Sequence, residues 1–194
     1  MQKSGIVAVG KHFPGHGDTE TDSHFDLPLV DHPIERLDSI ELFPFRRLIK
    51  NGIGGIMVSH LNVPALDSQQ KVATLSKPIV SHLLKDDMGF KGLVFTDALN
   101  MQGIRKFYPK GVVDARALIA GNDVLLFTED VPVAIKEIKL ALKSGELSWD
   151  QINEKCLKIL KAKYWLNLNE YKPIDRNKLW SGLNTQQGFL LRRK

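Results

Sequence analysis

Four short apolar runs recur along the chain, each followed by a more polar stretch. They cover residues 5–10, 53–59, 92–97 and 122–127, and they are rich in β-branched residues and leucine. Runs of this length and composition are typical of strands in a parallel sheet that is covered on both faces. The pattern therefore predicts four strands.

Helical patterns separate these strands. Ser76 is a suitable N-cap for a helix with Pro78 in its first turn, and Gly89 is a stop signal at its end. Residues 112–120 predict a second helix, which ends before a glycine. Residues 33–51 also have a helical pattern, and the proline at position 44 is expected to interrupt it.

A longer helix is predicted near the C-terminus. Ser148 and Gln151 have the spacing of a capping box, and the helical pattern continues to about Leu168. The residues expected on the apolar face of this helix are Ile152, Cys156, Ile159 and Leu160.

The alternation of strand and helix predicts an α/β fold with right-handed crossovers. A complete (β/α)₈ barrel takes about 250 residues, whereas this chain has 194. We therefore expect either a small open sheet or a partial barrel of about four βα units. The expected organisation is one domain over residues 1–168 and a linker or tail over residues 169–194, where periodicity is weak.

Composition and charge narrow the class of protein. Hydrophobic residues make up 43% of the chain and charged residues 25%, which is ordinary for a globular domain. No run is long enough to span a membrane, and the first residues show no signal-peptide pattern. The sequence does not assign a cellular compartment. The net charge is +5, because residues 136–194 hold 13 basic and 6 acidic residues, whereas residues 1–135 hold 14 basic and 16 acidic residues. Without a basic recognition motif, this excess favours a solvated helix face and no nucleic-acid partner.

Titratable residues follow three consecutive strands. Lys11 and His12 come after the first strand, His60 after the second, and Asp97 at the end of the third. Because the carboxyl ends of parallel strands share one edge, where ligands bind, these side chains predict a site. Asp97 is the strongest candidate, as a nucleophile, base or metal ligand, although such an aspartate can also cap a following helix.

The segment of residues 11–24, KHFPGHGDTETDSH, is the densest in chemistry, since seven of its residues can carry charge. In it, Asp22 and His24 have a spacing that lets a carboxylate orient an imidazole for general acid–base work. The alternative is a polar turn with an exposed histidine. A metal site is a weaker hypothesis, because no zinc-ligand spacing is present, and no nucleotide-binding loop or serine-hydrolase motif occurs.

The same segment resembles the signature of family 3 glycoside hydrolases, in the β-N-acetylglucosaminidase branch. Residues 55–60, GIMVSH, resemble the next strand of that family, and residues 89–101, GFKGLVFTDALNM, resemble its nucleophile strand. Residues 120–123, AGND, resemble the start of its last strand. The resemblance runs in order over residues 5–165.

This resemblance implies a retaining hydrolase of terminal β-linked N-acetylglucosamine, acting on cell-wall or chitin-type sugars without a cofactor. Asp97 would be the nucleophile, His24 the general acid/base and Asp22 its partner. Lys11 and His12 would hold sugar hydroxyls, and His60 would line the pocket. Some members of the branch transfer the sugar to phosphate, which is an alternative here.

The family barrel has about eight strands, and the strands of this chain correspond to its second half. The resemblance therefore implies a fragment whose site lacks groups, with two open sheet edges and an uncovered apolar face. Such a chain would need a missing N-terminal half or a second copy. A non-catalytic sugar-binding half barrel and a metal-dependent hydrolase are the competing hypotheses.

Overall fold

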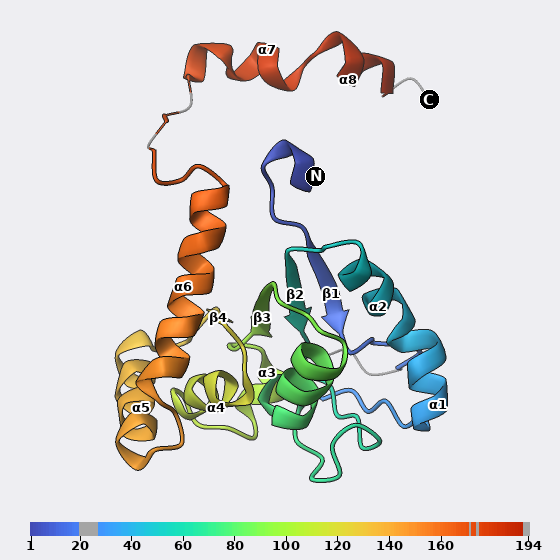
Figure 1. Ribbon diagram of the computed structural model, residues 1–194, viewed down its shortest axis with the longest axis vertical. Coiled ribbons are helices and arrows are strands. Elements are labelled where there is room, and N and C mark those ends of the chain that lie inside the picture. The colour runs from blue at the N-terminus through green and yellow to red at the C-terminus, as the bar shows by residue number, and fades with distance from the viewer. Residues whose placement is uncertain (20–26, 171, 174, 192–194) are drawn as a thin grey trace.

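The centre of the molecule is a four-stranded parallel sheet with the strand order β1-β2-β3-β4 (Figure 1). The computed structural model describes residues 1–19, 27–170, 172–173 and 175–191. The strands are β1 (Val9–Phe13), β2 (Gly55–Val58), β3 (Leu93–Ala98) and β4 (Val124–Leu126). This arrangement confirms the predicted α/β class and a partial barrel of about four βα units.

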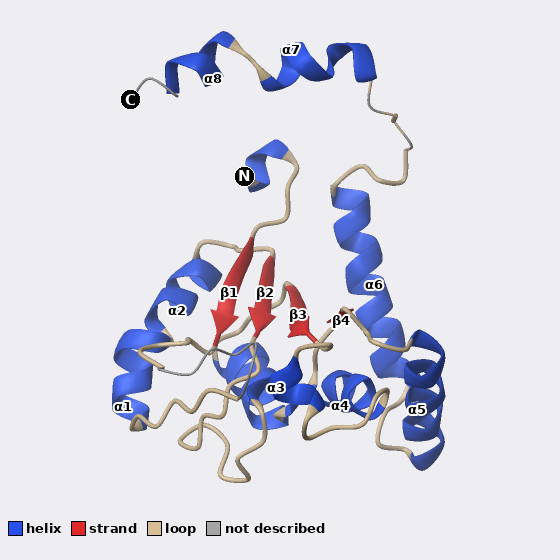
Figure 2. Ribbon diagram, turned by 180° about the vertical axis from the view of Figure 1, so that it is seen from behind, coloured by secondary structure: helices blue, strands red, loops and turns tan. Residues whose placement is uncertain are grey.

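Helices connect the strands and cover one face of the sheet (Figure 2). Two of these connecting segments, Leu37–Glu41 and Pro78–Asp87, are wound as π-helix, and two short turns, Gln2–Ser4 and Ala73–Leu75, as 3₁₀ helix. The α-helices of the body are α1 (Ile34–Arg36), α2 (Phe43–Lys50), α3 (Gln102–Arg105), α4 (Val112–Ala120), α5 (Val131–Ser144) and α6 (Trp149–Trp165).

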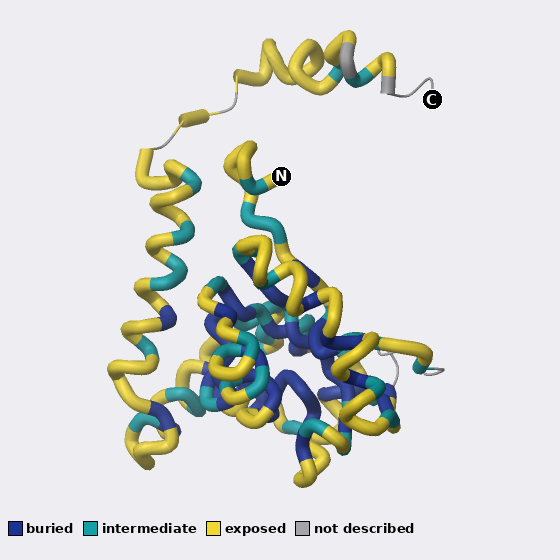
Figure 3. The backbone as a smooth tube through the Cα atoms, turned by 45° about the vertical axis from the view of Figure 1, so that its right-hand side comes forward, coloured by how far each residue is buried: buried dark blue, intermediate teal, exposed yellow. Residues whose placement is uncertain are grey.

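Side chains alternate across the strands, and one set forms the core with the helices. Ile56, Val58 and Val94 are fully buried and pack in one cluster with Phe13 and Phe45. The rings of these two phenylalanines meet edge to face with centroids 5.1 Å apart. Figure 3 shows the resulting concentration of buried backbone in the sheet and its adjoining helices.

The opposite face of the sheet is less covered than the sequence predicted. Its residues include Val9, which is 38% exposed, and the half-buried Met57, Phe95 and Val124. Gly55 lies between two of them, and a Cβ there would come 2.9 Å from Val9 and 3.0 Å from Phe95. The expectation of helices on both faces was therefore wrong, whereas the expected uncovered apolar face is present.

The first strand begins later than the apolar run predicted. The pairing with β2 determines where β1 begins, because Val9 and Gly10 lie opposite Gly55 and Ile56. The register is irregular between Gly10 and Phe13, so the segment with the candidate residues lies inside the strand and not after it. Residues 5–8, which belong to the predicted apolar run, therefore lie before the strand.

Most predicted helix signals are present in the structure. Ser76 Oγ accepts a hydrogen bond from the Ile79 backbone N–H at 3.2 Å, and Gly89 has the left-handed φ of 69° expected of a helix stop. The capping box is complete, since Ser148 Oγ accepts from Gln151 N at 3.2 Å and Gln151 Oε1 from Ser148 N at 2.9 Å. Helix α6 thus begins where the sequence predicted.

The buried side of α6 agrees only in part with the prediction, since Ile152 and Ile159 are half-buried as expected. Cys156 is exposed and Leu160 is 61% exposed, whereas Lys155 is only 9% exposed. The reason is electrostatic, because Lys158 Nζ lies 2.5 Å from the buried Asp123 carboxylate at the start of β4. The prediction of a wholly solvated basic face was therefore wrong for these two lysines.

Two further helical regions were not predicted. Helix α5 follows β4, and its start carries a signal that the sequence analysis missed, namely an Asp130 side chain that accepts from Val133 N at 3.1 Å. Beyond α6, the tail contains a 3₁₀ turn (Arg176–Lys178), α7 (Leu179–Leu183) and α8 (Gln186–Leu191), which lie apart from the sheet (Figure 1). Within the described residues, no helix has the length and apolar character needed to cross a bilayer.

Candidate active site

Asp97 lies near the carboxyl end of β3, on the less covered face of the sheet. Its side chain is 16% exposed, and Oδ1 accepts a hydrogen bond from the Ala98 backbone N–H at 2.8 Å. The following helix α3 begins at Gln102 without a side-chain cap. Asp97 is therefore not a helix cap, and its Oδ2 lies near His12 of β1.

The fold brings His12 close to this carboxylate. His12 Nε2 lies 3.9 Å from Asp97 Oδ2, and the imidazole is 35% exposed. The two residues are 85 positions apart in the sequence, and they meet because β1, β2 and β3 run parallel and side by side. Lys11, the adjacent candidate, is exposed on the same strand.

His60 also lies near Asp97, but it is enclosed by protein. The residue is 1% exposed, with Nδ1 2.8 Å from Thr74 Oγ1 and Nε2 3.0 Å from the Ala98 carbonyl oxygen. Burial lowers the pKa of this imidazole, while the Ala98 carbonyl and the Asp97 charge act in the opposite direction. These contacts favour a supporting role for His60 at the end of β3 over contact with a sugar.

The predicted acid–base pair, Asp22 and His24, lies outside the described residues. The loop that leads to it is described as far as Thr19, and its side chains are held by local contacts. His16 Nδ1 lies 2.6 Å from Thr19 Oγ1, and Asp18 Oδ1 lies 2.7 Å from His32 Nε2. The hydrogen bond with His32 lowers the pKa of the Asp18 carboxyl.

A buried glutamate supports this loop, and the sequence analysis did not identify it. Glu41 is 5% exposed, and a Cβ on Gly15 would come within 2.6 Å of the Glu41 Cβ, so only glycine fits there without displacement. Arg36 Nη2 lies 3.1 Å from Glu41 Oε1 and 3.9 Å from Asp18 Oδ2. The helical pattern of residues 33–51 gave no signal for these contacts, because they depend on the path of the loop.

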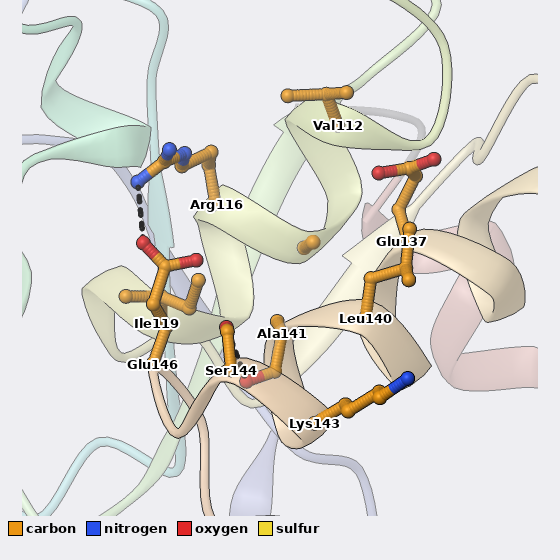
Figure 4. Close-up of a pocket in the computed structure, with 10 residues that line it drawn as sticks. Val112, Arg116, Ile119, Glu137, Leu140, Ala141, Lys143, Ser144 and Glu146 are labelled. Atoms are coloured by element: carbon orange, nitrogen blue, oxygen red, sulfur yellow. Dashed lines mark hydrogen bonds and ion pairs between the residues drawn. The ribbon is translucent and has the colours of Figure 1, made fainter.

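Two hollows on the surface differ in their relation to these residues. A groove of about 390 Å³ is lined by Lys11, His12, His16 and Glu41 among others. A second hollow of about 470 Å³ lies between α4 and α5, where Arg116 and Glu146 form an ion pair at 3.5 Å (Figure 4). None of the predicted site residues in the described part of the chain lines the second hollow, and the first is lined by Lys11 and His12 but not by Asp97 or His60.

The metal alternative concerns the same region. In the described part of the chain, no group of three or more histidine, cysteine, aspartate or glutamate side chains is arranged to hold a metal ion. The arrangement that is described combines a carboxylate, an imidazole and an exposed ammonium group at one sheet edge. Such a set can attack a carbon centre and hold hydroxyl groups.

A parallel sheet of βα units with its polar residues at the carboxyl ends of the strands is the architecture of barrel-type enzymes. The family model described as "Glycosyl hydrolase family 3 N terminal domain" matches residues 1–162. The chain therefore belongs to glycosyl hydrolase family 3. This finding confirms the family that the sequence motifs indicated.

Relatives with assigned names support the same branch of the family. The chain is 33% identical over 187 residues to beta-hexosaminidase A of Pseudoalteromonas piscicida, covering 84% of this chain and 31% of that protein. It is 38% identical over 151 residues to a beta-hexosaminidase of Nitrosospira multiformis, covering 77% of this chain and 41% of that protein. The chain thus spans less than half the length of these relatives.

Solved structures share the fold. A family 3 β-N-acetylglucosaminidase from Paenibacillus sp. superimposes with a TM-score of 0.90 at 37% identity, covering 99% of this chain and 37% of that one. The zinc-bound CbsA of Thermotoga neapolitana superimposes with a TM-score of 0.75 at 31% identity, covering 86% of this chain and 37% of that one. This chain therefore has the backbone arrangement of roughly a third of these larger proteins.

Proposed function

We propose that this chain carries the nucleophile half of a retaining β-N-acetylhexosaminidase site, which removes terminal β-linked N-acetylglucosamine. The observation that carries the proposal is the meeting of Asp97 Oδ2 and His12 Nε2 at 3.9 Å at the carboxyl edge of the sheet. The names of the relatives support the amino-sugar substrate. Cell-wall and chitin-type glycosides are the substrates expected.

In the proposed mechanism, Asp97 attacks the anomeric carbon and forms a covalent glycosyl–enzyme. His24 donates a proton to the departing oxygen and later accepts one from the attacking water, while Asp22 stabilises the imidazolium. Lys11 and His12 hold sugar hydroxyls. A histidine in this role, whether protonated or neutral, places no second negative charge beside the Asp97 carboxylate, whereas a second carboxylate would repel it.

The chain alone is proposed to lack turnover because its site is one-sided. The strands β1 and β4 each have one neighbour in the sheet, and the face below Asp97 is partly exposed. A missing half barrel or a second copy would pair with these edges and add sugar-binding groups. As an isolated chain, the protein is then an inactive half-site that binds sugar weakly.

The test is release of a chromophore from an N-acetyl-β-glucosaminide by the purified chain, alone and mixed with the part of the Paenibacillus enzyme that this chain does not match. We expect turnover only in the mixture, and loss of that turnover in Asp97→Asn. Robust turnover by the chain alone that disappears in Asp97→Asn would overturn the incomplete-site proposal while supporting the chemistry. Sugar binding without turnover in either form would favour the non-catalytic module.

Two further controls separate the alternative chemistries. Adding inorganic phosphate and analysing the product distinguishes a phosphorylase, which would yield a sugar phosphate, from a hydrolase. Because one structural relative is a zinc-bound protein, the same assay is repeated with a chelator. We expect unchanged turnover, and activity that disappears with chelator and returns with zinc or manganese would support the metal-dependent alternative.

A further inference from the structure

A smaller pocket lies where the loops that follow β3 and β4 meet. It has a volume of about 160 Å³. Its wall includes Leu99, Arg105, Lys110, Val113, Asp114 and Glu129. Leu99 directly follows β3, and Glu129 lies between β4 and α5. This pocket, the loop pocket, is therefore at the same end of the sheet as Asp97, although Asp97 does not line it.

Asp114 supplies the loop pocket with a buried carboxyl group. The residue is 1% exposed, and its Oδ1 atom has no hydrogen-bond partner among the described residues. Asp114 lies in the first turn of α4, where the helix dipole favours a negative charge but provides no hydrogen bond to Oδ1. Because buried polar atoms are normally bonded to protein or to a bound molecule, this oxygen indicates a donor that the chain does not provide.

The neighbours of Asp114 do not remove this need. Burial raises the pKa of the Asp114 carboxyl, against the effect of hydrogen bonds from Thr128 and from the backbone N–H groups of Asp114 and Gly111. These bonds leave Oδ1 without a partner. The negative charge of Glu129 also acts to raise this pKa, so the surroundings of Asp114 favour a positively charged donor.

The outer part of the loop pocket carries two cations that a carboxylate holds in place. Arg105 Nε lies 2.9 Å from Glu129 Oε2, and Lys110 Nζ lies 2.8 Å from Glu129 Oε1. Both oxygens of Glu129 are thus bonded. Guanidinium and ammonium groups each have several N–H donors, so Arg105 and Lys110 can donate to a ligand while they stay paired with Glu129. A carboxylate is the acceptor that such groups bind most strongly.

The charge and size of the loop pocket restrict the ligand further. Its two carboxylates and two cations cancel in formal charge, so a ligand without net charge preserves the balance. A cavity of about 150 Å³ holds a molecule of benzene's size, which has about six non-hydrogen atoms. Leu99 and Val113 are buried and give the wall an apolar part that suits a short hydrocarbon group.

We propose that the loop pocket binds a small zwitterionic amino acid. The ammonium group of the ligand donates to Asp114 Oδ1, and its carboxylate accepts from Arg105 and Lys110. Alanine has both charged groups, no net charge and a size that fits the pocket. This binding site is independent of the proposed glycosidase activity, because it uses neither Asp97 nor His12.

The experiment titrates the ¹⁵N-labelled full chain with alanine and follows the backbone amide signals by NMR. We expect the signals of Leu99, Lys110 and Asp114 to shift with a Kd of about 1 mM, since so small a ligand makes few contacts. Propionate lacks the ammonium group of alanine, ethylamine lacks its carboxylate, and glycerol is an uncharged polyol of similar size. Each of these three probes is expected to bind about tenfold more weakly than alanine, or less.

Two variants test the assigned contacts. Asp114→Asn is expected to weaken alanine binding by about tenfold or more, whereas Asp86→Asn, at an exposed aspartate, leaves it unchanged. Arg105→Gln alters a half-exposed side chain at little cost to folding, and it is expected to weaken binding of alanine but not of ethylamine. The amide spectrum of each variant shows whether it is folded.

The probes also define the results that would overturn the proposal. If the three amide signals did not shift with alanine up to about 100 mM, the pocket would hold water only. Glycerol binding as tight as that of alanine would assign the pocket to uncharged polyols. Both results come from the unaltered chain, so they do not depend on a variant that folds.

Discussion

Two aspartates at opposite ends of the sheet have the same side chain and different surroundings. Asp123 is 1% exposed and bonded to two ammonium groups and a backbone N–H. Asp97 is 16% exposed, accepts one backbone hydrogen bond, and has the His12 imidazole 3.9 Å away. Both oxygens of Asp123 are bonded to protein groups, whereas Oδ2 of Asp97 is positioned to meet a ligand.

The difference shows how the fold separates a structural from a reactive group. The carboxyl ends of the strands open onto the loops and the partly exposed face, so Asp97 keeps access to substrate. At the opposite end, Lys158 of α6 lies against the Asp123 carboxylate, which is enclosed by protein. Substitutions at the two ends should therefore affect different properties, and four measurements test this separation.

The largest effect is expected for Asp97→Asn. Loss of the nucleophile should lower the turnover number by roughly 10⁴-fold or more, measured with the chromogenic glycoside in the form of the protein that turns over. The free energy of unfolding should change little, because the amide oxygen of the substituted side chain can still accept the Ala98 hydrogen bond. A variant with full turnover would show that Asp97 is not the nucleophile.

Asp123→Asn should give the opposite result. Removal of one partner of a buried ion pair typically costs about 3–5 kcal/mol of unfolding free energy, which denaturant titration measures. Any folded fraction should retain the wild-type response to substrate, since Asp123 is at the other end of the sheet. Unchanged stability would mean that the lysine contacts with Asp123 do not hold in solution.

The pH dependence of the free energy of unfolding should show the titration of the Lys155 amine. Its folded pKa of about 8 lies below the ordinary lysine value. Between the two values, the unfolded chain binds more protons, so the free energy of unfolding rises with pH, by at most about 1.4 kcal/mol per unit for this group. Lys155→Met should remove this rise and stabilise the chain at pH 7 by about 1–3 kcal/mol. A rise that persists in the variant would assign it to other groups.

The smallest effect is expected at the start of α6. Ser148→Ala removes the cap that accepts from Gln151 N, at a typical cost of about 1 kcal/mol. The exposed Ser39, whose hydroxyl donates to the Arg36 carbonyl inside a helical segment, is the matched control. If Ser148→Ala cost no more than Ser39→Ala, the capping box would not help to hold the lysines against Asp123.

The sequence was most informative where local signals decide the structure. The four strands, the capping box and Asp97 follow from apolar runs and short motifs, and the structure contains them in order. Contacts between distant segments were not predictable in the same way. The start of β1 depends on its pairing with β2, and the inward face of α6 depends on Asp123, which lies 32 residues before Lys155 in the sequence.

The candidate site shows the same division. Motif matching predicted His12 and Asp97, but their separation of 3.9 Å depends on three strands aligning. The ion pair of Glu41 and Arg36 beside the loop could not be predicted from the hydrophobic periodicity, since a charged residue in a helical pattern normally faces solvent. The roles of Asp22 and His24 remain predictions from the motif, because these residues lie outside the described part.

The strand order has a consequence for how the chain unfolds. In the described sheet, each strand is hydrogen-bonded only to its sequence neighbours, so the backbone pairing resembles a row of units coupled to nearest neighbours. In such a row, the interior units gain from two interfaces and the terminal units from one. Amide exchange should therefore be slowest in β2 and β3 and faster in β1 and β4, and the chain should lose its structure from the two ends inward.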